Sequence, residues 1–308
     1  MVTPTQPNNP SQTHNFGNPS QHLQINPNRI AAPTPRAALL AATPTTHRNN
    51  STETFEAHLQ TIVHHGPAEQ RNIRVRIANT ILTAYRNNAD TINLDDSKLG
   101  QLGQQAADFV HALQQLPQLQ TLNLKHNYLG NLGTYTGAFA QALSQLVQLH
   151  TLNLSDNLLS CLGEQAGLFA QGLGQLAQLH TLDLRRNDLG CLGTHAKAFS
   201  QGLGRLAQLK NLNLWINDLG SLGAHAGAFA QGLGQLAQLQ TLNLGGNKLG
   251  RLGAYTPAFI SAISQLPQLE QLSLSGYDYI LFKEIWPNIE FHARIQNNLI
   301  HASRQTSC

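Results

Sequence analysis

Residues 181–217 read TLDLRRNDLGCLGTHAKAFSQGLGRLAQLKNLNLWIN and hold one complete structural unit and the start of the next. The pattern LxxLxLxxNxL begins at Leu179 and begins again at Leu209, thirty residues further along the chain. Repetition at a fixed period of about 20–50 residues is the sequence signature of a solenoid. In a solenoid each unit packs only against its neighbours, so this pattern decides the fold of most of the chain.

A short β-strand with leucines on its inner face is predicted once in every unit. Side chains alternate along a strand, so the leucines point inward while Thr and Asn point outward. Seven such strands, thirty residues apart, are expected at 91–94, 121–124, 151–154, 181–184, 211–214, 241–244 and 271–274.

An asparagine stands just after most of these strands. Its side-chain amide both donates and accepts hydrogen bonds, so it is suited to bond the free backbone groups of the turn that leaves the strand. The asparagine column consists of Asn127, Asn157, Asn187, Asn217 and Asn247. Ser97 and Tyr277 stand at the equivalent positions of the first and last units, and such departures are expected in terminal repeats.

The second half of each unit predicts a glycine turn followed by a helix. Glycine supplies turn geometry that other residues avoid, and it closes the turn at Gly103, Gly133, Gly163, Gly193, Gly223 and Gly253. Two columns share the inner face of the helix: Phe109, Phe139, Phe169, Phe199, Phe229 and Phe259, then Leu113, Leu143, Leu173, Leu203, Leu233 and Ile263. A third column is always small and predicts a close approach of neighbouring helices: Ala112, Ala142, Gly172, Gly202, Gly232 and Ala262.

One unit offers too few apolar groups to fold alone, so we expect the array to fold together. Strands lie ~4.8 Å apart, whereas packed helices need ~8–10 Å. This mismatch predicts an α/β horseshoe, with a parallel β-sheet on the concave face and helices on the convex face.

The ends of the chain differ from the repeats. Residues 1–50 are rich in Pro, Asn, Gln, Thr and Ser and are expected to form a disordered tail. Residues 51–89 carry two helical patterns and are expected to cap the array of repeats at 90–276. Residues 277–308 are expected to form the C-terminal cap, with Trp286 and a last helix carrying Ile289, Ile295, Leu299 and Ile300.

Composition narrows the classes of function. Only 11% of the 308 residues are charged and the formal net charge is +3, so a nucleic-acid partner is not expected. No apolar run approaches the ~18 residues of a membrane span. No conventional signal peptide is visible, and three cysteines do not form a disulfide framework. We expect a monomer without a cofactor in a reducing, cytoplasmic setting.

The repeats resemble ribonuclease-inhibitor-like leucine-rich repeats. LxxLxLxxNxL is followed by a glycine four residues after its last leucine, as from Leu129 to Gly133, and then by the helix. This sequence has two extra residues before the helix and uses Phe where Leu is usual. The resemblance implies a protein-binding horseshoe. The near-identical repeats and the uncharged tail are also similar to effectors of intracellular bacteria, which implies export into a host cytosol without a conventional signal peptide.

The repeats vary most at the two positions after the last strand leucine. These pairs are expected to face solvent, and Trp and Arg are the residues that interfaces enrich. The sequence therefore predicts a partner-binding surface at Lys125, His126, Asp156, Asp183, Arg185, Arg186, Lys210, Trp215 and Ile216. The alternative is drift at unrestrained positions, with Trp215 lying flat on the sheet.

The same repeated columns contain candidates for other kinds of site. Histidines stack at His150 and His180, but zinc needs three or four converging ligands, so no metal site is expected. Cys161 and Cys191 share a loop column without predicting a disulfide in a reducing compartment. No catalytic set emerges, and a non-enzymatic scaffold is the first hypothesis. A regulator acting on a partner enzyme remains open: a GTPase activator using Arg185 or Arg186, or a ubiquitin-ligase adaptor using 51–88.

Overall fold

The computed structural model describes residues 50–285, 294–296 and 299–303. Of the tail predicted at 1–50, residues 1–49 lie outside the described residues, as do Trp286 and Ile289.

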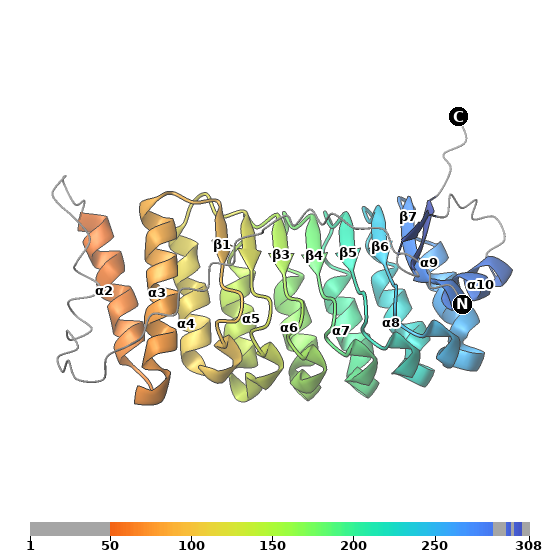
Figure 1. Cartoon of the computed structure of the whole chain (residues 1–308), viewed down its shortest axis with the longest axis horizontal. Helices are drawn as coiled ribbons and strands as arrows, with labels where there is room; N and C mark the ends of the chain where they lie inside the picture. Colours follow the sequence, from red (N-terminus) through yellow and green to blue (C-terminus); the bar gives the residue numbers. More distant parts are fainter. Residues whose placement is uncertain (1–49, 286–293, 297–298, 304–308) are drawn as a thin grey trace, which may run out of the picture. The chain divides into compact units, whose positions relative to one another are not determined.

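Seven parallel strands form one sheet in chain order, as the repeats predict (Figure 1). Leucines pair with leucines across the ladder, for example Leu152 with Leu182, so the thirty-residue period is also the register of the sheet. The strands are β1 (Thr91–Asn93), β2 (Thr121–Asn123), β3 (Thr151–Asn153), β4 (Thr181–Asp183), β5 (Asn211–Asn213), β6 (Thr241–Asn243) and β7 (Gln271–Ser275). Repeat n below is the repeat that contains strand βn.

One helix follows each of the first six strands, and the helices form a second layer (Figure 1). They are α4 (Gln104–Ala112), α5 (Thr136–Ser144), α6 (Ala166–Leu173), α7 (Ala196–Leu203), α8 (Ala226–Leu233) and α9 (Thr256–Ser264). Short 3-10 turns join strand to helix, for instance at Leu189–His195. All six closing glycines have positive φ, such as 54° at Gly193, which confirms the reason for glycine there. This is the architecture of a leucine-rich-repeat solenoid.

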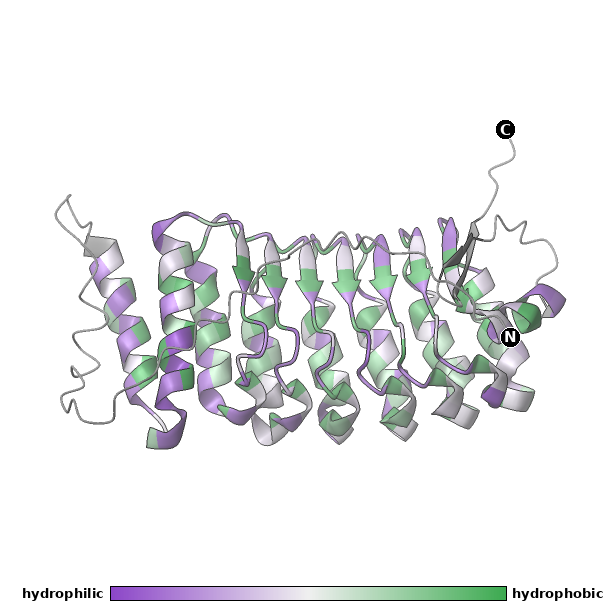
Figure 2. Ribbon diagram, viewed as in Figure 1, coloured by the Kyte–Doolittle hydropathy of each residue, from purple (hydrophilic) through white to green (hydrophobic). Residues whose placement is uncertain are grey.

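The core lies between the sheet and the helices. All six phenylalanines of the helix column are 0% exposed, and so are Leu113, Leu143, Leu173, Leu203, Leu233 and Ile263 on the same face. Figure 2 shows hydrophobic residues recurring at the same place on successive strands. The predicted inner face is therefore confirmed residue by residue.

Neighbouring helices approach closely at the small-residue column. A Cβ added to Gly202 would lie 2.5 Å from the carbonyl carbon of Ala170, and one added to Gly172 would lie 2.6 Å from the carbonyl oxygen of Ala140. Real Cβ atoms do not come this close to backbone. Glycine in the middle of these helices is therefore a packing requirement, which offsets its cost of up to about 1 kcal/mol in helix propensity.

The asparagine column forms a continuous ladder beneath the turns. Asn187 accepts at Oδ1 from the backbone N–H of Asn157 at 2.9 Å and donates from Nδ2 to the carbonyls of Leu154 and Leu184 at 2.9 Å. Each side chain thus connects its own repeat to the preceding one. In the last repeat Tyr277 is 71% exposed, and the buried Asp278 takes over, accepting from the Gly250 N–H at 3.2 Å.

Within the described residues, α2 (Asn50–His64) and α3 (Arg71–Arg86) precede the first strand and are joined through a turn at Ala68–Gln70. Phe55, Leu59 and Ile62 of α2 are buried, as are Ile77 and Ile81 of α3. The sequence pattern did not identify Arg74, which is 1% exposed. Its Nε donates to the Val63 carbonyl at 3.1 Å and its Nη2 to the Gly66 carbonyl at 3.3 Å, so this arginine holds the link between the two helices.

The C-terminal prediction was partly wrong. A helix does follow the last parallel strand, α10 (Gly276–Ile285), but no helix contains Ile295, Leu299 and Ile300. These residues lie in strands β8 (Arg294–Gln296) and β9 (Leu299–Ser303). β9 pairs antiparallel with β7, and β8 pairs antiparallel with β9. The physical reason is the edge of β7, whose backbone groups would otherwise lack partners.

No helix in the described part of the chain is long and apolar enough to cross a bilayer.

Candidate functional site

The sheet brings five of the predicted residues together where β4 and β5 end. Asp183 is the last residue of β4, Arg185 and Arg186 follow it, and Trp215 and Ile216 follow β5. Because the two strands are parallel and in register, with Asp183 beside Asn213, these segments leave the sheet at the same edge. We call Asp183, Arg185, Arg186, Trp215 and Ile216 the strand-exit patch.

Asp183 and Arg185 contact one another. The Asp183 Oδ1 accepts from the backbone N–H of Arg185 at 3.0 Å, and Oδ2 lies 3.1 Å from the Arg185 Nε. The second contact is an ion pair without hydrogen-bond alignment, because Nε has no hydrogen-bond partner. Burial raises the pKa of Asp183, and the contacts with Arg185 oppose that shift without cancelling it. The carboxylate is therefore occupied within its own repeat.

Arg186 and Trp215 also contact one another. The guanidinium carbon of Arg186 lies 5.1 Å from the centroid of the Trp215 ring, within the range of a cation–π interaction. Arg186 is exposed and Trp215 is half-buried. Among the described residues, neither the Arg186 guanidinium nor the indole Nε1–H of Trp215 is hydrogen-bonded to an acceptor. The pair thus presents apolar surface together with free donors.

Ile216 occupies a strained backbone conformation. Its φ is 51°, in the left-handed region, where a β-branched residue is an outlier. The same position carries Asp96, His126, Asp156 and Arg186 in earlier repeats and Gly246 in the next. Only at Gly246 is there no side chain, and a Cβ there would lie 2.8 Å from the Ile216 Cγ1. The Ile216 side chain therefore occupies the space that a side chain at Gly246 would need.

Lys125, His126 and Asp156 stand at the strand ends of repeats 2 and 3, beside the patch, and the Asp156 N–H donates to the Arg185 carbonyl at 3.0 Å. His126 stands between two carboxylates, with Nδ1 3.6 Å from Asp95 Oδ1 and Nε2 3.4 Å from Asp156 Oδ2. Lys125 lies beside His126 in repeat 2 and contributes to the electrostatic field at Asp183. Lys210 precedes β5 and Trp215 follows it, so five steps along the strand, of ~3.3 Å each, separate them. The structure does not bring Lys210 into the strand-exit patch.

Exposure at these positions was predicted only in part. His126 and Arg186 are exposed as expected, but Ser155 is fully buried and Gly245 is buried as well. Trp215 and Ile216 are half-buried. The exposure of the pairs after the strand leucine therefore differs from repeat to repeat.

Lys210 belongs to a column that contains the stacked histidines. The rings of His150 and His180 are 5.1 Å apart and nearly parallel, at 6°, and the Nδ1 atoms of both are buried without a hydrogen-bond partner. Among the described residues no three His, Cys, Asp or Glu side chains converge on a possible metal position. Cys161 and Cys191 are exposed free thiols.

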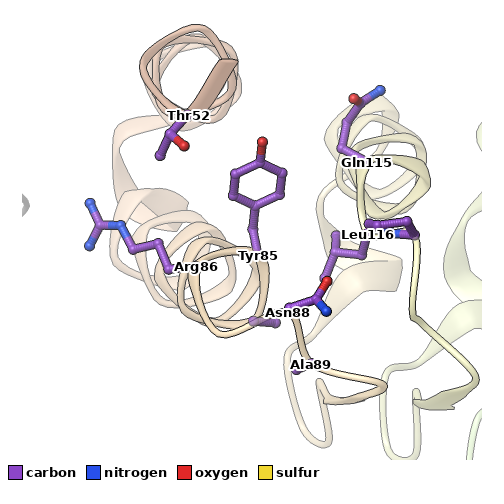
Figure 3. Close-up of a pocket in the computed structure, with 9 residues that line it drawn as sticks. Thr52, Tyr85, Arg86, Asn88, Ala89, Gln115 and Leu116 are labelled. Atoms are coloured by element: carbon purple, nitrogen blue, oxygen red, sulfur yellow. The ribbon is translucent and has the colours of Figure 1, made fainter. Parts of the chain in front are cut away.

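A cavity of about 330 Å³ lies where α3 meets repeat 1 (Figure 3). Tyr85 extends from α3 into the space between α2 and the turn that carries Gln115 and Leu116 (Figure 3). Arg86, at the rim, is paired with Glu56 at 2.5 Å, and Tyr85 packs on Phe55 with ring centroids 4.4 Å apart. The charge of Arg86 is thus neutralised by Glu56. We interpret the cavity as incomplete packing between α2, α3 and repeat 1.

No protein-family model and no curated protein sequence matches the chain. Among solved structures, the leucine-rich-repeat-containing protein LegL7 from Legionella pneumophila is 21% identical, with a TM-score of 0.36, over 63% of this chain and 68% of that protein. A leucine-rich-repeat protein of Leptospira interrogans is 19% identical, with a TM-score of 0.20, over 63% of this chain and 74% of that protein. The architecture stated above rests on the strand register of this chain itself.

Proposed function

We propose that this solenoid is a non-enzymatic interaction scaffold that binds a partner protein through the strand-exit patch. The observation that carries the proposal is Ile216, a β-branched residue held at φ 51° beside a half-buried tryptophan. Strained conformations cost roughly 1–3 kcal/mol and concentrate at functional sites. In this array every other repeat has a more tolerant residue at that position.

Chemistry supports the same location. Trp and Arg are enriched at the centres of interfaces, where a few residues contribute most of the binding free energy. The Arg186–Trp215 pair is pre-organised by its cation–π contact, so less conformational entropy is lost when a partner binds. The equivalent pair in repeat 6 is Gly245 and Gly246, so repeat 6 adds no side chain at these positions to cover Ile216.

Affinity capture with the double variant Arg186→Ala and Trp215→Ala tests the proposal. We expect loss of the partner while circular dichroism and the unfolding midpoint stay close to those of the unchanged protein. Lys197→Ala is the matched control, because Lys197 is an exposed cation on α7 of the same repeat as Arg186. Retention of the partner by the folded double variant would rule out the strand-exit patch.

A regulator acting on a partner enzyme is the second candidate, and it is favoured by one observation: Arg186 has no carboxylate partner among the described residues, whereas Arg185 is paired with Asp183. A GTPase activator working through an arginine finger would then use Arg186. A turnover assay should show acceleration that Arg186→Ala abolishes and Arg185→Ala largely keeps. Binding without any change of turnover favours the scaffold.

A third candidate, a ubiquitin-ligase adaptor, would use the helices at 51–88 to recruit other proteins. We propose instead that these helices cap the array, because Ile77 and Ile81 of α3 are 0% exposed. Deletion of 51–88 would then expose the core of repeat 1 and unfold the array. An adaptor segment could be deleted without loss of the fold.

A further inference from the structure

The hydrogen-bond donors and acceptors of the strand-exit patch indicate the chemical class of the partner segment that would bind there. This inference rests on the function proposed above. Asp183 is the patch's one carboxylate, and both of its oxygens face Arg185. Arg186 and the Trp215 Nε1–H keep donor groups without acceptors among the described residues. After the Asp183–Arg185 pair is set aside, the patch has one uncompensated positive charge and an excess of donors.

A second cation extends the same surface. Lys125 stands in repeat 2 at the position of Arg185 in repeat 4, and its ammonium group makes no ion pair in the described part of the chain. Asp156 stands in repeat 3, between the two cations, and contacts His126 at 3.4 Å. At the strand ends of repeats 2 to 5, the two carboxylates of Asp156 and Asp183 thus face three cations, Lys125, Arg185 and Arg186. From repeat 2 to repeat 5 the sheet measures ~14 Å, the distance that about four or five residues of extended chain cover.

We propose that the partner contacts this surface with a short extended acidic segment that also carries a large aliphatic or aromatic side chain. Its carboxylates bind Lys125 and Arg186, and its apolar side chain packs on Trp215 and Ile216 above the glycines of repeat 6. Charge-assisted hydrogen bonds to arginine are among the strongest polar contacts in proteins, and they match the donors that the patch leaves free. A carboxylate also accepts from the indole N–H, whereas the side chains of a basic segment bring no acceptor and would repel Lys125 and Arg186.

Tryptophan fluorescence gives a direct readout on the full chain. The protein has two tryptophans, so Trp286→Phe leaves Trp215 as the single reporter. The probes are short synthetic peptides of Asp, Glu and Leu, with three matched controls: Gln in place of the acids, Lys in place of the acids, and Ala in place of Leu. We expect the acidic, Leu-containing peptide to change Trp215 emission at low salt and to bind more weakly at high salt, because exposed charges are screened.

The variants then assign the contacts. We expect Arg186→Ala and Lys125→Ala each to weaken binding of the acidic peptide by about tenfold, the loss typical of one charged contact. Lys197→Ala should leave the affinity unchanged. If the Gln or Lys peptide binds as tightly as the acidic one, the acidic class is wrong although the patch can still be the interface. If a single-stranded RNA oligomer binds more tightly and competes, the surface recognises phosphate and the proposal fails.

Peptide binding and partner capture together distinguish a failure of this inference from a failure of the proposed function. A neutral apolar peptide that binds only while Trp215 is present would overturn the acidic class and keep the strand-exit patch. Partner capture that survives the Arg186→Ala and Trp215→Ala double substitution would overturn the patch, and the acidic class with it.

Discussion

The guanidinium of Arg186 lies over the ring of Trp215, 5.1 Å from its centroid, and connects repeat 4 to repeat 5 on the surface of the sheet. Both residues occupy the variable positions that follow a strand, where the framework leaves the side chain free to differ between repeats. Beside them, Ile216 adopts a conformation that does not suit its side chain. Repeat 5 thus carries two large, half-buried side chains, Trp215 and Ile216, at the end of its strand. Repeat 6 has only Gly245 and Gly246 at the equivalent positions.

Replacement of Ile216 should relieve that strain. Ile216→Asn places a residue that tolerates the left-handed region at φ 51°. We expect the free energy of unfolding in urea to rise by about 0.5–1 kcal/mol, because relief of roughly 1–2 kcal/mol of strain exceeds the loss of partial apolar burial. Ile216→Val keeps the β-branch and should give no gain. Equal stability of the Asn and Val variants would show that no strain is stored here.

Loss of one asparagine from the ladder should destabilise the whole array. Asn187→Ala removes an acceptor for the Asn157 N–H and donors to the Leu154 and Leu184 carbonyls, all at 2.9 Å in the interior. Each buried polar group left unpaired costs about 1–3 kcal/mol, so we expect a loss of about 3–5 kcal/mol in chemical unfolding. Asn211→Ala, on the exposed face of β5, should change stability little. A small effect at Asn187 would mean that water replaces the ladder.

Two glycine-to-alanine substitutions should change the stability of the fold in opposite directions. Gly202→Ala would place a Cβ 2.5 Å from the Ala170 carbonyl carbon and push α7 away from α6, at a cost of about 1–3 kcal/mol. Gly137→Ala, near the start of α5, meets nothing within 4 Å and should stabilise the protein by about 0.5–1 kcal/mol. Thermal unfolding of the two variants side by side is the measurement. Equal effects would contradict the role of the small-residue column.

Asp183 should destabilise the fold at neutral pH. Asparagine occupies the equivalent strand position in neighbouring repeats, at Asn153 and Asn213, and makes the same turn hydrogen bond. Since burial raises the folded-state pKa of Asp183, its ionised form is less favourable in the folded than in the unfolded chain. That cost is complete above the folded pKa and vanishes below the unfolded value of about 3.9.

Asp183→Asn should therefore raise the free energy of unfolding at pH 7, and the gain should shrink as the pH falls through the acidic range. Urea unfolding at several pH values measures both. The reciprocal change, Asn153→Asp, should lower stability at pH 7 with the same pH dependence. A gain for Asp183→Asn that does not depend on pH would show that charge burial is not its cause.

Much of the fold could be predicted because the same residue types recur at the same positions of each repeat and pack in the same way. The phenylalanine column, the asparagine ladder and the positive-φ glycines all follow from residue type at fixed spacing. The C-terminal strands could not be predicted, because there the period is lost and Ile295, Leu299 and Ile300 suit a strand as well as a helix. Arg74 and Asp278 were missed since their burial depends on partners elsewhere in the chain.

The candidate site was predicted as a set of residues, but its geometry was not. Spacing placed Arg186 and Trp215 in neighbouring repeats, and the structure adds their contact. The left-handed conformation at Ile216 had a visible signal: Asp96, Asp156 and Gly246 in the same column are residues that favour turns. Lys210 was grouped with Trp215 by closeness in sequence, although a strand separates them.

Site-specific photo-cross-linking tests the central claim most directly. A benzophenone side chain is introduced at 216, in the strand-exit patch, and separately at 197, on the helix face of repeat 4. The account predicts that, in an extract containing the partner, irradiation yields a discrete adduct from position 216 that excess acidic, Leu-containing peptide suppresses, and none from position 197. An adduct from position 197 with none from position 216 would contradict it.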